Sequence, residues 1–112
     1  MMIMNMTPHA IKVQIGETEI HTFNPSGMIA RVESKSGEDL LPIDGIPVRS
    51  SPTFGPVVGL PAMAPDTVFI VSAMVLARCK GRMDVFGPDT GPDAVRRDGQ
   101  IVAVRRLLRA EG

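Results

Sequence analysis

The stretch from residue 67 to residue 71, Thr67-Val68-Phe69-Ile70-Val71, is continuously apolar and rich in β-branched residues. A short run of this kind is typical of a strand that is buried on both faces. We therefore predict that it forms the central strand of the fold. Directly after it, Ser72 suits a helix N-cap, and good helix formers from Ala73 to Lys80, followed by Gly81, predict one short helix.

Upstream of this strand, residues 10–23 have the pattern of a β-hairpin. Their sequence, AIKVQIGETEIHTF, consists of two alternating segments around a Gly16-Glu17 loop. Glycine at the first loop position suits a two-residue type II′ turn. This register places Val13 opposite Ile20, and we predict that both are buried on the same face.

Further short strands are predicted on both sides of the central one. The alternation resumes from Met28 to Glu33, and six of the ten prolines then fall between Pro42 and Pro65. Because internal prolines break helices, this region can hold only short edge strands, such as Ile46–Arg49 and Pro56–Leu60. Near the C-terminus, Asp98-Gly99 lies between two apolar segments and favours the type I′ turn of a second hairpin.

These elements predict a mainly β (α+β) fold in a single domain that spans residues 1–112. A chain of 112 residues has the usual size of one domain. The architecture expected is a small sandwich or partly closed barrel of six to eight short strands with one short helix.

Composition restricts the partners and the location. The chain has four Phe, no Trp and no Tyr, so base-stacking platforms, and with them nucleic-acid binding, are not expected. A single cysteine excludes an intrachain disulfide, and no signal peptide or membrane-length apolar run is present, which predicts a cytoplasmic protein of the host cell and no membrane partner.

Charge is zero in total but unevenly placed. Residues 1–77 carry four Lys and Arg against seven Asp and Glu, whereas residues 78–112 carry eight against five. Such a split can mark a basic face for an anionic partner, and an ordinary solvated surface is the alternative.

Several short motifs, taken in order, resemble a known family. They are Asn5-Met6-Thr7-Pro8-His9, Pro25-Ser26-Gly27, Arg31-Val32, Gly59-Leu60-Pro61, Phe69-Ile70-Val71-Ser72 and Pro88-Asp89-Thr90-Gly91-Pro92. The chain is similar over nearly its whole length to small proteins of phages, prophages and some bacterial genomes that open with Asn-Leu-Thr-Pro-His. Met6 stands here for the usual Leu, and Phe69 for the frequent Tyr. The resemblance implies a setting, that of an accessory factor that binds a host protein or a host small molecule.

No motif predicts a catalytic or metal site. Asp89-Thr90-Gly91 is the triplet of aspartic proteases, but Pro88 and Pro92 bracket it, which favours a surface turn. A triad drawn with Ser72 and His9 lacks the Gly-x-Ser-x-Gly elbow that exposes such a nucleophile. Two histidines and one cysteine do not complete a common zinc ligand set, and no cofactor is expected.

One anion-binding site is predicted where the central strand runs into the helix. Unpaired N–H groups at the helix N-terminus favour an anion there. The residues expected to bind it are Ser72, Arg82, Thr7, His9, Arg96, Arg97, Arg105 and Arg106. In the alternative interpretation, Ser72 is only a cap worth about 1 kcal/mol and the arginines face water.

The function expected is that of a non-enzymatic phage- or prophage-encoded accessory protein. It would bind a host protein or a small anionic, nucleotide-like ligand. One purpose of such binding would be to counter host defence. A small virion or assembly component and a small hydrolase with an unrecognised site are the alternatives. Self-association is also expected, because a mean hydropathy of +0.13 and short strand edges leave apolar surface to cover.

Overall fold

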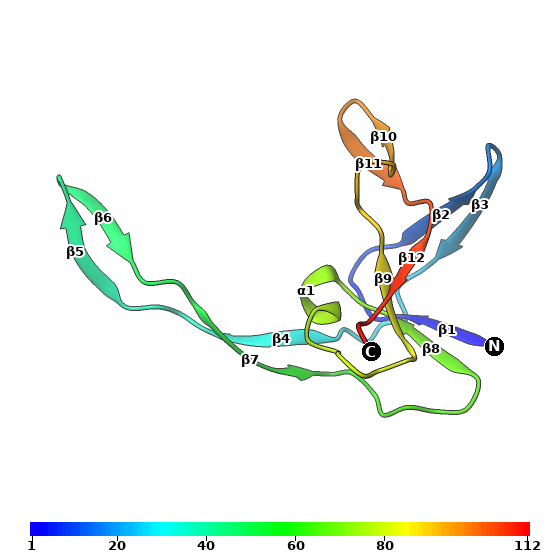
Figure 1. Ribbon diagram of the computed structural model, residues 1–112, viewed down its shortest axis with the longest axis horizontal. Helices are drawn as coiled ribbons and strands as arrows, with labels where there is room; N and C mark the ends of the chain where they lie inside the picture. The colour runs from blue at the N-terminus through cyan, green and yellow to red at the C-terminus, as the bar shows by residue number, and fades with distance from the viewer.

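The computed structural model describes residues 1–112 and contains twelve strands and one short helix. The predicted mainly β class is confirmed, but the strands outnumber the six to eight that we expected. They form one four-stranded and four two-stranded sheets and do not close into a barrel (Figure 1). The strands are only three to six residues long, and most pair with a single neighbour, so no continuous sheet is available to close.

A four-stranded sheet with the order β1-β8-β9-β12 is the centre of the molecule. Its strands are β1 (Met2–Asn5), β8 (Thr67–Ile70), β9 (Val85–Pro88) and β12 (Leu107–Arg109). β1 and β9 run parallel to β8, and β12 is antiparallel to β9. The predicted central strand is confirmed, because β8 has a neighbour on each side and Phe69 and Ile70 are buried.

Two strands of this sheet were missed in the sequence. β1 lies in the methionine-rich N-terminal segment, which lacks the alternation of apolar and polar residues that is typical of a strand. In β9, the residues Gly87 and Pro88 are typical of a turn and do not predict a strand. Gly87 is needed within the strand, because a Cβ there would lie 3.0 Å from Leu76 Cδ2 and 3.2 Å from the Val71 carbonyl oxygen. The glycine therefore lets the helix pack directly on β9.

The helix α1 (Ala73–Leu76) begins where predicted and ends earlier. Ser72 is its N-cap, and its side chain accepts a hydrogen bond from the Val75 amide at 3.4 Å. Beyond Leu76 the amides of Arg78 and Cys79 bond three residues back, to the carbonyls of Val75 and Leu76. This tighter winding and the left-handed Gly81 (φ +90) turn the chain back toward β9, so the helix has one turn instead of continuing to Lys80.

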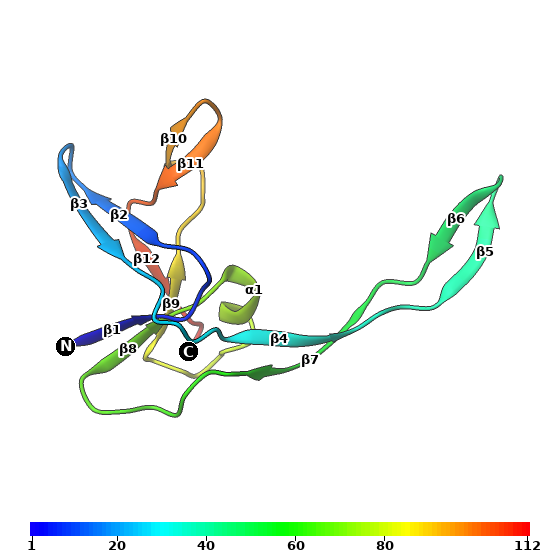
Figure 2. The same ribbon diagram turned by 180° about the vertical axis from the view of Figure 1, so that it is seen from behind.

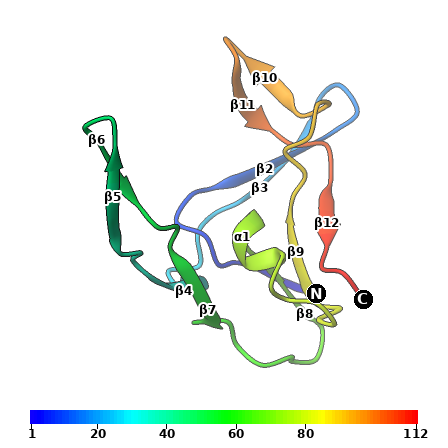
Figure 3. The same cartoon turned by 60° about the vertical axis from the view of Figure 1, so that its left-hand side comes forward.

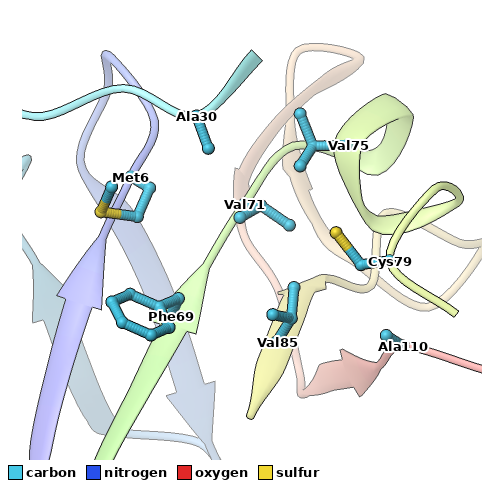
Figure 4. Close-up of a cluster of buried hydrophobic side chains, with 8 residues drawn as sticks. All are labelled: Met6, Ala30, Phe69, Val71, Val75, Cys79, Val85 and Ala110. Atoms are coloured by element: carbon cyan, nitrogen blue, oxygen red, sulfur yellow. The ribbon is translucent and has the colours of Figure 1, made fainter. Parts of the chain in front are cut away.

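The main core lies where β8, α1 and β9 meet. Figure 4 shows its side chains pointing toward one another from these elements and from the segments around Met6 and Ala30. The cluster consists of Met6, Ala30, Phe69, Val71, Val75, Cys79, Val85 and Ala110. A second, smaller cluster contains Val13, Ala94 and Val104.

The first hairpin, β2 (Ile11–Ile15) and β3 (Glu19–Phe23), is confirmed, but its predicted register is wrong by one residue. Val13 lies opposite His21, and the loop has three residues, 16–18. Val13 is buried, whereas Ile20 is 54% exposed. The observed register aligns Ile11 with Phe23, and both pack against the smaller core cluster. This tertiary contact overrides the turn preference.

The second hairpin forms as predicted from β10 (Val95–Arg97) and β11 (Gln100–Ala103). Asp98 and Gly99 both have positive φ, 53° and 80°, as a type I′ turn requires. It stands beside β2, since Gln14 and Val104 are joined by a backbone hydrogen bond of 2.8 Å.

Residues 31–58 form a long two-stranded projection, called the arm from here on. Its base is β4 (Arg31–Lys35) paired with β7 (Thr53–Val58), and its tip is β5 (Asp39–Ile43) paired with β6 (Ile46–Arg49). β6 has the predicted bounds, β4 begins three residues after the predicted Met28, and β7 lies earlier than the predicted Pro56–Leu60. Figures 1 and 2 show the arm extending away from the rest of the molecule, and the whole chain measures 53 Å along its longest axis.

Candidate functional site

The Asn-x-Thr-Pro-His segment forms a closed hydrogen-bond network at the end of β1. Asn5 Oδ1 accepts from the Thr7 amide at 2.9 Å and from Thr7 Oγ1 at 2.7 Å. Asn5 Nδ2 donates to the carbonyl oxygens of His9 and Phe23, at 2.7 and 2.8 Å. Asn5 therefore ties the end of β1 to the end of β3.

Thr7 and His9, both predicted to contact an anion, belong to this network. Thr7 is buried, and its hydroxyl shares its one proton between Asn5 Oδ1 and the His9 carbonyl, which lies 2.9 Å away. His9 takes part through its carbonyl oxygen and not through its imidazole, which lies on an exposed residue. The hydroxyl of Thr7 is thus already committed, and the ring of His9 is open to solvent.

Ser72, the centre of the predicted anion site, caps a helix of one turn. Its Oγ is held by the Val75 amide, and its carbonyl accepts from the Leu76 amide at 2.8 Å. The amides of Ala73 and Met74 are the only N–H groups of that turn left for another partner.

Arg82 lies past the helix and is paired with Asp84. Arg82 Nε and Nη2 donate to the two carboxylate oxygens, each at 2.9 Å, and Nη2 also donates to the Pro61 carbonyl at 3.0 Å. This pairing lowers the pKa of Asp84, whose side chain is buried, and raises the pKa of Arg82. The guanidinium thereby attaches the loop that follows β7 to the start of β9.

A basic hollow of about 340 Å³ lies between the base of the arm and the turn after α1. Arg78, Lys80 and Arg82 line it together with Pro56, Val57, Leu60 and Cys79. The Arg78 guanidinium lies over the Phe54 ring, 4.9 Å from its centroid, while Lys80 is exposed and makes no hydrogen bond. Of the predicted anion ligands, only Arg82 lines this hollow.

The four remaining predicted ligands lie elsewhere. Figure 1 shows β10 and β11, whose hairpin carries Arg96 and Arg97, projecting away from α1. Arg96 donates to loop carbonyls, including that of Pro92 at 3.0 Å, and Arg105 donates to the Gly16 carbonyl at 2.9 Å. The structure does not bring these residues to Ser72.

Arg106 forms an ion-pair cluster with the loop after β9. Its Nη1 donates to Asp89 Oδ2 at 2.7 Å, and its Nη2 donates to Asp93 Oδ2 at 2.7 Å. This contact lowers the pKa of Asp93 and raises that of Arg106. Asp89 also accepts from the Gly91 amide at 3.0 Å, so Asp89-Thr90-Gly91 is the turn that its flanking prolines indicated.

No family model, curated protein or solved structure matches this chain. No three His, Cys, Asp or Glu side chains gather where they could hold a metal ion. The single helix is far shorter than a membrane crossing requires.

The tip of the arm has an apolar face that nothing in the chain covers. Leu40 lies opposite Val48 and Ile43 opposite Ile46. Ile46 and Val48 are two residues apart and share one face of β6, and an irregularity in β5 between Leu40 and Ile43 keeps both of these residues opposite their partners. Ile43 is 65% exposed and Ile46 is 63% exposed. These four residues are called the apolar face of the arm below.

Sequence reasoning missed this arm although one signal for it was present. Asp44-Gly45 lies between two apolar segments, and both residues have positive φ, 47° and 78°, as in a type I′ turn. The prolines between Pro42 and Pro65 instead favour short edge strands that are not paired with each other. The length of the arm has no local signal, because it depends on the pairing of β4 with β7, whose partners lie about 18 to 27 residues apart in the sequence.

Proposed function

We propose that this protein is a non-enzymatic accessory protein, encoded by a phage or prophage, that acts by binding another protein through the arm. The apolar face of the arm is the observation that carries this proposal. Isolated hairpins are marginally stable in water, and contiguous exposed aliphatic side chains mark protein-interaction sites. A protein partner would cover this face and hold the arm in place.

The shape of the arm supports a protein as the partner. A projecting two-stranded arm presents a long, narrow surface with backbone edges on both sides, which suits contact with another folded chain. The alternative of a virion or assembly component uses the same binding chemistry and differs only in the identity of the partner.

Native mass spectrometry of the tagged protein, purified from the cells that produce it, tests this function. We expect the wild-type chain of 12.0 kDa to be retained in complexes with further protein chains. The double variant Ile43→Asp/Ile46→Asp should lose them. A wild-type protein that carries no other protein chain would overturn the proposal.

A small anionic ligand is the second candidate, and the basic hollow favours it. Arg78 and Lys80 place two positive charges there in addition to the paired Arg82. Titration with inorganic phosphate and a panel of nucleotides should then show binding that Lys80→Ala weakens several-fold, with Lys35→Ala on the arm as the matched control. If Lys80→Ala and Lys35→Ala bind these anions equally well, or if the wild-type protein binds none of them, the basic hollow is not an anion-binding site.

A further inference from the structure

The accessible surface of the chain is too large for a compact monomer. It measures 7774 Å², about 1,800 Å² more than the roughly 6,000 Å² expected for a monomer of 12.0 kDa. The radius of gyration is 17.2 Å, against about 13 Å for a compact domain of 112 residues. A specific interface removes about 800 Å² from each partner. The excess is about twice that area, which is what each chain would bury if it gave its arm to one neighbouring copy and received an arm itself.

The arm is the main source of this excess. Every residue of β5 is exposed, and β6 has only Val48 partly buried. Neither core cluster includes a residue from the tip. No other part of the chain therefore covers the apolar face, and its further burial depends on a second molecule.

A groove elsewhere on the same chain has the complementary character. It lies between β2, β11 and the end of β9, has a volume of about 160 Å³, and is lined mainly by apolar residues, among them Ile11, Pro88, Ile101 and Val102. Ile101 and Val102 are also exposed on β11. The groove can accept aliphatic side chains of the size that the arm presents.

The charges around the two surfaces are opposite. At the tip of the arm, residues 38–49 contain three carboxylates and one arginine, which is paired with Asp39, while residues 95–106, beside the groove, contain four arginines and one aspartate, and of these arginines Arg106 is paired with Asp89 and Asp93. Lys12 lines the groove, and Arg97 on β10 is exposed and makes no hydrogen bond. Opposite charges of this kind favour one docking orientation over others.

The arm cannot reach the groove of its own chain. It leaves the body at the base formed by β4 and β7, and in Figures 1 and 3 its tip stands well apart from β2 and β11. Figure 3 also shows that the tip and both hairpins project to the same side of the body.

We infer that the partner of the arm is a second copy of this chain, with the apolar face of one copy seated in the groove between β2 and β11 of the next. This inference rests on the proposed function, since it identifies the protein that the arm binds. Reciprocal exchange of two arms gives a closed dimer, and exchange in one direction around a ring gives a larger closed oligomer.

Sedimentation of the purified recombinant protein is the first test. We expect a mass that is a multiple of 12.0 kDa for the wild type and 12.0 kDa for Ile43→Asp/Ile46→Asp. Ile20→Asp is the matched control, because Ile20 is 54% exposed on β3 and lies outside both surfaces, and it should remain oligomeric. Far-UV circular dichroism checks that each variant is folded.

Disulfide trapping tests the docking itself. A protein with Ile43→Cys and a differently tagged protein with Val102→Cys are coexpressed, purified and oxidised with oxidised glutathione. We expect a disulfide that joins the two tags, and none when Ile20→Cys replaces Ile43→Cys. Cross-linking by the control pair, or none by the test pair, overturns the docking site.

The outcomes separate the two proposals. A wild-type protein that stays at 12.0 kDa at all concentrations overturns the second copy as the partner. If that monomer still captures a different protein through the arm in its producing cells, the proposed function stands alone. If the double variant Ile43→Asp/Ile46→Asp is still an oligomer, the arm does not mediate association, and its role in both proposals is overturned.

Discussion

Asn5 shows how a single side chain can organise distant segments. It is 1% exposed, and its amide group makes four hydrogen bonds, to Thr7, His9 and Phe23. Its backbone carbonyl also accepts from the Ser26 amide at 2.9 Å. The Asn5-Met6-Thr7-Pro8-His9 segment is therefore a structural junction between β1, β2 and β3 in this chain.

Replacing Asn5 should destabilise the protein strongly. Asn5→Ala removes the side-chain partner of the Thr7 amide and of the Phe23 carbonyl, while the Thr7 hydroxyl and the His9 carbonyl keep each other, and we expect a loss of about 3 kcal/mol in the free energy of unfolding. Asn5→Asp keeps the contacts to Thr7 but directs a carboxylate at two carbonyls, so it should also destabilise. Urea denaturation measures both, with the exposed Asn24→Ala as control. Equal stability of Asn5→Ala and Asn24→Ala would contradict this role.

The pair of Arg82 and Asp84 predicts a loss of stability in acid. Because hydrogen bonding to Arg82 lowers the pKa of Asp84 in the folded state, folding favours the ionised carboxyl. Its contribution is complete above the ordinary aspartate pKa of 3.8 and is lost as the pH falls through the lower folded-state value.

Asp84→Asn should therefore reduce the free energy of unfolding at pH 7 by about 1–3 kcal/mol. The difference from the wild type should shrink in acid, where the wild-type carboxyl becomes protonated. Urea denaturation at pH 7, 4 and 2.5 measures it. A difference that stays constant from pH 7 to pH 2.5 would show that the ion pair does not act as inferred.

Cys79 should react only when the protein opens. The thiol is buried in the main core, and this burial raises its pKa, so the thiolate is both scarce and inaccessible. We expect labelling by iodoacetamide at pH 8 to be at least about a hundredfold slower than in urea-unfolded protein. Labelling at the rate of the unfolded chain in native buffer would contradict the packing of α1 against β9.

At the scale of elements, the arm depends on a joint between its base and its tip. Gly37 and Ser50 lie at this joint, where Ser50 Oγ accepts from the Glu38 amide at 2.7 Å and the Ser50 amide donates to the Glu38 carbonyl at 2.8 Å. A Cβ at Gly37 would overlap the Ser50 carbonyl. The two strands approach there more closely than any side chain permits.

Gly37→Ala should therefore separate the strands at the joint. We expect faster amide hydrogen exchange at Glu38 and Ser50, with little change in β8, because the joint does not contact the core. Gly45→Ala is a useful comparison, since it disturbs the turn at the tip without a close backbone contact. Unchanged exchange in Gly37→Ala would mean that the joint tolerates a side chain.

At the scale of the whole molecule, the sheet should fold without the tip of the arm. No residue from 37–50 belongs to either core cluster. Replacing this segment with an Asn-Gly turn should change the free energy of unfolding by less than about 1 kcal/mol. The reference is the monomeric variant Ile43→Asp/Ile46→Asp, because association would otherwise add to the stability of the full chain. Small-angle scattering should show a smaller radius of gyration, and an unfolded product would contradict the division of the chain into body and arm.

Local chemistry in the sequence determined the parts of this fold that depend on few residues. The buried strand at 67–71 is evident from its apolar run, the Ser72 cap from its side chain, and the turn at Asp98-Gly99 from the positive φ that both residues adopt. Each follows from preferences that act within about ten residues. Taken together, these local preferences determine the mainly β class of the fold.

Tertiary structure alone decided how these parts are combined. The register of the first hairpin follows the packing of Ile11 and Phe23 on a cluster that includes Val104, about ninety residues away. β1 pairs with β8 across more than sixty residues, and the predicted anion ligands are separated because they lie on different elements, where Arg96 bonds to the Pro92 carbonyl and Arg105 to the Gly16 carbonyl. Such long-range pairings have no local signal, since their free energy arises only when distant segments meet.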